Sequence, residues 1–512
     1  MVVGKRWKNK MEQNIEISKM KALFNNFTLK QFLIKENIIM ITISLLIGYG
    51  IWEIVLGWEQ LIGFKLSHHY LFPVTGSFYN PGPYCLFLGI IIPLALNNII
   101  KYKRGIFYWE GLIYIILTFS LMPILLGRTG WIATIVGVIV TAFGTGHIKM
   151  PHKKNLFLFI TFLVFTILII FYILYKLKPA SALGRFFLWG IGMSALIVEP
   201  LNGVGWNHVP GVLGFLQENY FSQNQESNFI KVAGSPECAF NEYLQIGIAF
   251  GIPALILFIL ILGFSAYSSW KGKEYGLTGS IVAIAIGCIG SYPFRFYEFI
   301  ILAGVLMIIG ILSFKSNTKY LFFRICLSIG IFFICLISLQ GIRHSKLIEN
   351  DWKLKRYAYQ YTLSSKNIDF LNSLMIVQKD NPNFLFDYGK ALRDSKLYDK
   401  SNEILKKGIY VSSDPMFLNL IGRNYQDMGN PIKAEEFYKR SINRLPGRLY
   451  PYYLLAKLYA DPLFLNKEKF MSIYREALKL EPKVMSPAIK DMKDELKELY
   501  DKFDQPLYYF IE

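Results

Sequence analysis

Cysteine and acidic side chains are scarce in this chain of 512 residues, and each shortage argues against a class of protein. The five cysteines form no CxxC pair, and all but Cys238 lie in apolar segments, so the sequence supports neither a disulfide framework nor a zinc site. Lys and Arg number 55 against 36 Asp and Glu, which gives a formal net charge of +19. Because the basic residues are spread between apolar segments and along a polar tail, we expect no nucleic-acid partner.

Apolar residues are abundant: 53% of the chain is hydrophobic and 16% is aromatic. Both fractions exceed those of an ordinary soluble domain and predict an all-α, polytopic membrane helix bundle. A helix needs about 20 apolar residues to cross the hydrocarbon core, and the sequence offers about nine such segments. They lie near residues 37–57, 82–99, 106–126, 130–146, 155–175, 243–267, 277–292, 296–314 and 320–340.

Basic residues mark one side of these predicted spans. Residues 1–36 hold eight Lys and Arg and lack an apolar core or cleavage site, so we expect a cytoplasmic N-terminal segment without a cleavable signal peptide. The opposite short loops hold only Lys65, Arg128 and Arg295. With the spans above, the insert 176–242 and the tail 341–512 fall on the outer side, and loss of one span would move the tail to the cytoplasm. Alternate loops are richer in basic residues: Lys101, Lys103 and Arg104; Lys149, Lys153 and Lys154; Lys271 and Lys273; Lys315 and Lys319.

The tail 341–512 is charged and amphipathic, and it has a period near 34 residues. This spacing resembles tetratricopeptide repeats and predicts a soluble α-solenoid that follows the membrane domain 37–340. The pattern leaves open a generic helical domain, and it identifies no protein partner. The clearest unit runs from Pro415 to Arg448 and carries Gly422, Tyr425, Gly429, Ala434, Tyr438 and Pro446 at its characteristic positions.

Two short polar segments at the outer ends of predicted spans carry candidate substrate-binding residues. Asn80 precedes Pro81 and Gly82 in a turn that leads into a helix, whose free amides favour an anion. A plain turn at the membrane surface explains this segment equally well. Arg128, in the sequence GRTGW, lies on the outer side in a very short loop between two predicted spans, where it is a candidate for substrate binding. The alternative is an arginine whose side chain snorkels to a lipid phosphate.

The insert and its boundaries carry the candidate catalytic residues. Arg185 lies among aromatic residues on a predicted interfacial helix, where a guanidinium suits a diphosphate but also suits a membrane anchor. Glu242 begins a span and is either a general base or a partner of the helix dipole. Asn241 precedes it as a candidate for orienting the acceptor. His208, the lone histidine of the insert, and Arg295, between two later spans, complete the set, although both also suit ordinary loops.

These segments, in this order, resemble the O-antigen ligase and O-antigen polymerase superfamily of bacterial envelope enzymes, from about Thr75 to Gly263. A C-terminal tetratricopeptide module is common in one branch of that superfamily. The resemblance rests on SFYNPGPY, on GRTGW (similar to the family's S-R-G-x-x element), on the Arg185 helix, on PLNGVGWN, and on AFNEYLQIGIAFGI (similar to its H-N-E-x-L-Q-x-x-x-E-x-G signature).

The resemblance implies a transferase of the inner membrane that uses neither metal nor cofactor and acts on the periplasmic face. The donor would be a glycan on undecaprenyl diphosphate, with Arg185 and Arg128 on the diphosphate and Glu242 or His208 on the acceptor. The acceptor would be lipid A core in a ligase, a second lipid-linked glycan in a polymerase, or a protein in an oligosaccharyltransferase. Two positions depart from the family pattern: Phe240 replaces its histidine and Phe250 its later glutamate.

Two other classes of function compete with a transferase. A transporter needs ionisable residues deep inside several spans, whereas Glu53 is a rare acid within a predicted span and lies near its outer end. An envelope scaffold would use its repeats to bind a partner protein, and it would lose its role completely without residues 341–512. Charged residues cluster at one face, which favours an enzyme on that side over a transporter, and a scaffold makes no demand for outer arginines.

Overall fold

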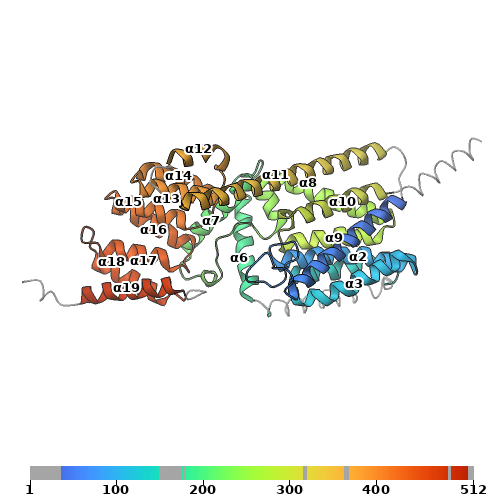
Figure 1. The fold of residues 1–512 in the computed structure, drawn as a ribbon, viewed down its shortest axis with the longest axis horizontal. Helices are drawn as coiled ribbons and strands as arrows, with labels where there is room; N and C mark the ends of the chain where they lie inside the picture. The colour runs from blue at the N-terminus through green and yellow to red at the C-terminus, as the bar shows by residue number, and fades with distance from the viewer. Residues whose placement is uncertain are drawn as a thin grey trace, which may run out of the picture. The chain divides into compact units, whose positions relative to one another are not determined.

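The computed structural model describes residues 36–148, 179–314, 320–361, 368–481 and 486–504, together with Thr161 and Lys176. Every regular element in these residues is a helix, which confirms the predicted all-α class (Figure 1). The contacts divide the chain into two compact units. Unit 1 comprises residues 1–150, 262–287 and 301–332, and unit 2 comprises residues 151–261, 288–300 and 333–512.

Eight helices in the described ranges coincide with predicted spans, and the ninth predicted span, 155–175, lies outside those ranges. Three of the eight, α4 (Arg128–Gly144), α9 (Tyr275–Gly290) and α10 (Tyr297–Ser313), are apolar but short. A count of nine spans therefore stays a prediction. Five helices are long and apolar enough to cross a membrane: Glu36–Leu61, α2 (Pro81–Tyr102), α3 (Ile106–Leu125), α8 (Glu242–Lys271) and the Leu321–Arg356 part of α11 (Leu321–Tyr361).

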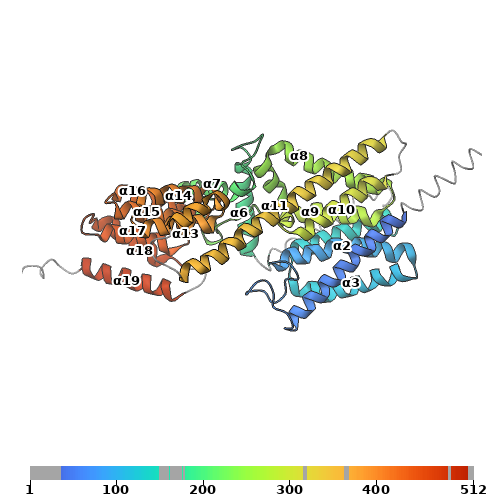
Figure 2. The ribbon, with the colours of Figure 1, turned by 45° about the horizontal axis from the view of Figure 1, so that its top comes forward.

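Small residues set the packing in unit 1, where α2 lies against α3 and α4. Figure 2 shows α2 and α3 side by side. A Cβ added at Gly130 would lie 2.7 Å from Cys85 Sγ, and one at Gly89 would lie 2.1 Å from Thr134 Oγ1. Only glycine therefore lets the backbones of α2 and α4 approach so closely. This approach brings the start of α4 close to the first turns of α2.

Helix α8, of which residues 242–261 belong to unit 2, is not the straight span that its apolar run predicts. Gly251 has φ +86, and Pro253 follows inside the same helix, so the regular hydrogen bonding breaks there. Carbonyls freed by the kink accept hydrogen bonds from the PLNGVGWN segment: Val204 N donates to Ile248 O and Gly205 N to Ala249 O, each at 2.9 Å. Two of the sequence motifs thus form one structural feature.

The tail is built from short helices, most of which pack mainly on their neighbours in sequence. Asn381, Asn430 and Asn466 cap three of these helices with their side chains. Helix α11 runs without interruption past residue 340, where the composition changes from apolar to polar. The tail helices are α12 (Ile368–Gln378), α13 (Pro382–Asp394), α14 (Tyr398–Val411), α15 (Met416–Asp427), α16 (Pro431–Arg444), α17 (Leu449–Ala460), α18 (Lys467–Lys479) and α19 (Pro487–Asp504).

Glycines inside the tail helices make room for large side chains of the next helix. A Cβ at Gly422 in α15 would lie 2.5 Å from the ring of Tyr438 in α16, and one at Gly389 in α13 would lie 2.5 Å from Leu405 in α14. Gly422 and Tyr438 are two of the positions that the 34-residue period singled out. The period therefore marks places where one helix packs against the next.

We expect Gly422→Leu to lower the free energy of unfolding of the tail by about 1–3 kcal/mol, because the new side chain would overlap the Tyr438 ring. Thermal or denaturant unfolding of the full chain, followed by a probe in the tail, measures this loss. Gly341→Leu is the matched control, since no atom lies within 4 Å of a Cβ at Gly341. Equal stability of the two variants would contradict the packing described here.

Candidate functional site

Three of the predicted site residues in unit 2 meet at the turn that joins α9 to α10. Arg185, on α6 (Pro179–Ala195), donates from Nη1 to the carbonyl of Gly290 at 2.7 Å. Glu242, the first residue of α8, accepts from the Phe294 backbone N–H through Oε1 at 2.8 Å. Arg295 ends the short helix η3 (Pro293–Arg295) in the same turn. The turn thus gathers two guanidinium groups and one carboxylate from segments far apart in sequence.

The guanidinium of Arg185 lies over the ring of Phe240, with 5.8 Å between Cζ and the ring centroid. Tyr292 packs edge-on against the same ring at 4.9 Å, and Trp189 Nε1 donates to Phe240 O at 3.3 Å. Phe240 has φ +50, an unfavourable conformation for an aromatic residue, so these surroundings must hold it in place. Phe240 therefore forms an aromatic platform beneath the guanidinium of Arg185.

Glu242 is nearly inaccessible, with 1% of its surface exposed. Its Oε2 atom has no hydrogen-bond partner among the described residues. Arg295 donates from Nη2 to the carbonyl of Glu237 at 2.9 Å and lies 3.5 Å from the exposed carboxylate of that residue. A buried carboxylate with one oxygen anchored and the other unpaired is costly to maintain, which is a common property of functional groups.

Two other titratable side chains at the turn are poor proton acceptors. Burial raises the pKa of the Cys238 thiol, although the positive charge of Arg295 partly opposes this. Burial also raises the pKa of Tyr292 to about 12. Both groups therefore stay protonated at neutral pH, and neither supplies a thiolate nucleophile or a general base.

Asn241 and His208 occupy different positions around this site. The Asn241 side chain accepts from Leu244 N at 3.1 Å and so caps the start of α8. His208 is exposed at the end of η1 (Trp206–His208), directly before α7 (Val209–Gln223). The cap gives Asn241 a structural role. A role of Asn241 in substrate binding stays a prediction, and so does a catalytic role of His208.

The other two predicted binding residues lie in unit 1, at the adjoining starts of α2 and α4. Asn80 caps α2 by accepting from Gly82 N at 2.9 Å. Arg128 is the first residue of α4 and is half-buried. A Cβ added at Gly127 would lie 3.5 Å from Gly82 O, so the two helix starts are close neighbours. Two positive helix ends and a guanidinium together favour an anion.

Sequence reasoning missed the residues that hold this unit 1 loop in place. Gln60 accepts from the backbone of Thr75 and of Gly76, each at 2.8 Å, and donates to Gly76 O at 2.9 Å. Glu53, fully buried on the same helix, accepts from Ser77 Oγ at 2.7 Å. The only sequence signal was an acid inside an apolar run. The structure gives Glu53 a loop-anchoring role.

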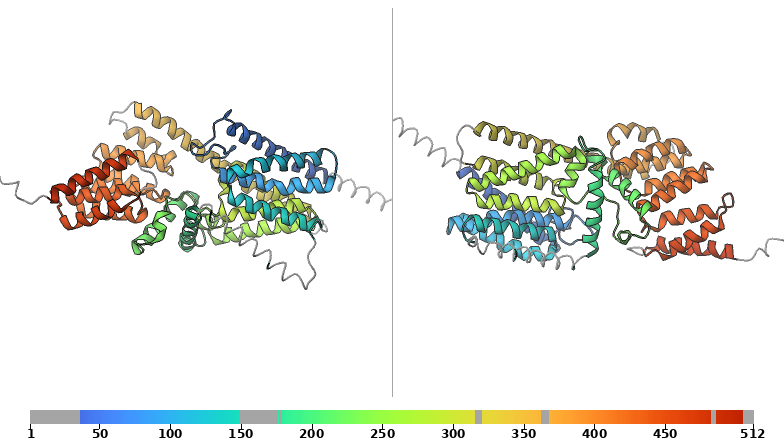
Figure 3. Two further views of the ribbon diagram at one scale, coloured as in Figure 1. Left: turned by 90° about the horizontal axis from the view of Figure 1, so that it is seen from below. Right: turned by 180° about the vertical axis from the view of Figure 1, so that it is seen from behind.

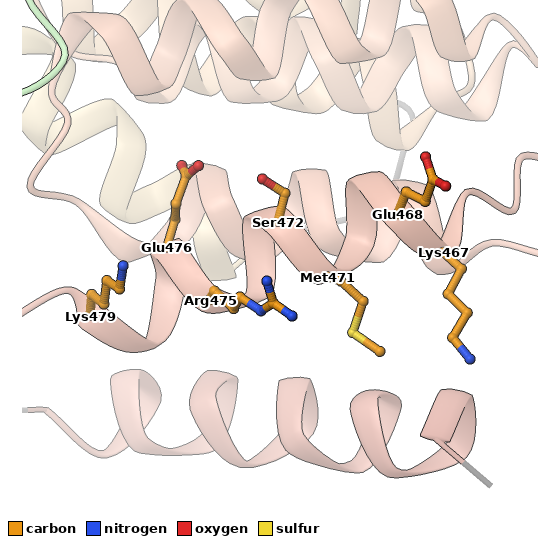
Figure 4. Close-up of a pocket in the computed structure, with 7 residues that line it drawn as sticks. All are labelled: Lys467, Glu468, Met471, Ser472, Arg475, Glu476 and Lys479. Carbon is orange, nitrogen blue, oxygen red and sulfur yellow. The ribbon is translucent and has the colours of Figure 1, made fainter.

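A separate open pocket of about 750 Å³ lies along α18 in the tail (Figure 4). None of the predicted site residues lines it. Its lining mixes both signs of charge and comes from one helix: Lys467, Glu468, Met471, Ser472, Arg475, Glu476 and Lys479.

Residues 113–259 match a family model described as O-antigen ligase, and no curated protein matches the chain. The matched segment contains Arg128, Arg185, His208, Asn241 and Glu242, whereas Asn80 and Arg295 lie outside it. Together with the apolar helices, the match indicates a multi-pass membrane protein with a glycan-processing activity similar to that of O-antigen ligases.

Proposed function

We propose that this protein is a membrane glycosyltransferase that moves a glycan from undecaprenyl diphosphate to an acceptor hydroxyl on the periplasmic face. The observation that carries the proposal is the cluster of Arg185, Glu242 and Arg295 at one turn, two of which lie inside the segment similar to O-antigen ligases. The loop-charge asymmetry supports the periplasmic orientation of this cluster and of the tail.

In the proposed reaction, the acceptor oxygen attacks the sugar carbon that is bonded to the diphosphate. A carbon–oxygen bond to the acceptor forms while the bond to the diphosphate breaks, and the diphosphate leaves with that electron pair. Arg185 stabilises the growing negative charge on the leaving group, with Arg295 as a second cation. Oε2 of Glu242 takes the proton of the acceptor hydroxyl, because it is the unpaired oxygen of that carboxylate.

Arg128 and Asn80 are proposed to bind the donor through unit 1. We expect Arg128→Ala to raise the KM for a polyprenyl-diphosphate-linked glycan by about 10–100-fold, because a charge-assisted bond to phosphate is lost. Initial-rate measurements over a range of donor concentrations test this expectation. Lys65→Ala is the matched control, since Lys65 is another outer cation that already pairs with Glu59 at 2.7 Å. An unchanged donor KM in Arg128→Ala would remove Arg128 from donor binding.

The tail is proposed to be a tetratricopeptide-like solenoid. The close contacts at Gly422 and Gly389, the positive φ of Gly429 and the buried Ala434 support this assignment, because they fall at the small-residue positions of the period. Asn–Pro pairs begin two of its helices, α13 and α16, with capping side chains.

The acceptor distinguishes a ligase from a polymerase or a protein oligosaccharyltransferase, and the envelope profile of a deletion strain tests all three. Loss of every long lipopolysaccharide chain supports the ligase, which we favour because the matched family model is described as O-antigen ligase. A core that carries a single unit indicates a polymerase. A normal lipopolysaccharide ladder together with loss of protein glycosylation indicates glycan transfer to protein. An unchanged lipopolysaccharide ladder together with unchanged protein glycosylation would contradict the proposed function.

A further inference from the structure

Helix α7 of the insert is joined to the tail by a buried ion pair within unit 2. The carboxylate of Glu218 accepts from Arg440 Nε at 2.7 Å and from Arg444 Nη2 at 2.7 Å. Glu218 is 6% exposed and Arg444 is fully buried. Both arginines belong to α16, more than two hundred residues further along the chain. The ion pair thus joins α7 of the insert to α16 of the tail.

The same face of α7 is shaped to fit the tail backbone. A Cβ added at Gly211 would lie 2.2 Å from Tyr410 O, and one at Gly214 would lie 2.9 Å from Ser413 Cβ. Gln217, next to Glu218, donates to the carbonyl of Arg444. Two glycines, one amide and one carboxylate therefore lie on the face of α7 that meets α14 and α16. Figure 3 shows the ribbon of this segment, in green, beside the orange helices of the tail.

Helix α7 also packs against α6, the helix that carries Arg185. Phe187 of α6 lies 5.2 Å from Phe221 of α7 between ring centroids, and Leu213 belongs to the same buried cluster. Leu445, which directly follows α16, also packs against this cluster. A continuous chain of packed side chains thus runs from α16 through α7 to α6.

We propose that the α14–α16 face of the tail binds α7 of the same chain and thereby positions α6, with Glu218 as the positioning residue. Removal of one partner from a buried ion pair leaves an uncompensated charge, so this contact strongly disfavours other placements of α7. The tail thereby holds α7, and through it α6, in one position. Its effect on transfer rests on the function proposed above, whereas the docking itself does not depend on any activity.

Hydrogen exchange of the purified full-length chain tests this proposal without an assay of transfer. We expect Glu218→Gln to speed exchange of α7 amides by about a hundredfold, because Arg440 and Arg444 lose their counter-charge. Gly211→Leu should act in the same direction by sterically displacing α7 from Tyr410. Amides of α6 around Arg185 should exchange faster in both variants, while those of α17 to α19 should not change.

Two matched variants serve as controls. Glu226→Gln removes an exposed acid from the same insert, and Gly341→Leu enlarges a glycine that has no neighbour within 4 Å. Unchanged α7 exchange in both test variants would overturn the docking. Faster exchange in α7 alone would overturn the link to α6. Equal acceleration through α17 to α19 would show that Glu218 supports the whole tail, which also contradicts a positioning role.

Discussion

Arg185→Ala is expected to lower the rate of glycan transfer by about 10²–10³-fold, because it removes the cation that stabilises the negative charge on the departing diphosphate. Arg185→Lys should recover only part of that loss. A lysine keeps the charge but loses the planar group that lies over Phe240 and donates to Gly290 O. Transfer from a polyprenyl-diphosphate-linked glycan in isolated membranes measures both variants.

Lys231→Ala is the control for Arg185, since Lys231 is an exposed cation in the same insert. We expect wild-type transfer in this control, which separates a general loss of positive charge from a loss at the site. Wild-type rates in both Arg185 variants would exclude Arg185 from the mechanism.

The second large effect is expected at Glu242. Glu242→Gln should lower kcat by about 10²–10⁴-fold, because a carboxamide cannot take the proton of the acceptor hydroxyl. The amide oxygen of the new side chain can still accept from Phe294 N, so the turn and the start of α8 should keep their structure. Initial rates at saturating donor and acceptor give kcat directly.

Glu237→Gln is the matched control for Glu242, because its carboxylate also lies near Arg295 but is largely exposed. We expect it to retain near-normal kcat. If Glu242→Gln were as active as this control, the general base would have to be another group, and His208 would be the next residue to replace.

The helices of this protein were predictable because their signals are local. Apolar runs identified eight of the observed helices, and the Asn80-Pro81 pair marked the start of α2. The run from 243 onward did not reveal the break at Gly251, because a single Gly and Pro are tolerated in apolar helices. The composition boundary near residue 340 likewise gave no warning that α11 continues through it.

The candidate site was only partly predictable, because its contacts join distant residues. Arg185, Glu242 and Arg295 were each proposed from the sequence, yet nothing local indicated that one turn would hold all three. The aromatic platform at Phe240 and the pairing of Glu218 with α16 were missed for the same reason. A single sequence shows residue types and spacing but not which partners fold together.

Release of polyprenyl diphosphate by the purified full-length chain in lipid vesicles is the most direct test of the transferase account. With a lipid-linked glycan and an acceptor present, the account predicts one diphosphate lipid released for each glycan transferred, and little release from Arg185→Ala or Glu242→Gln. Equal release from all three proteins, or glycan transfer without any released diphosphate lipid, would contradict it.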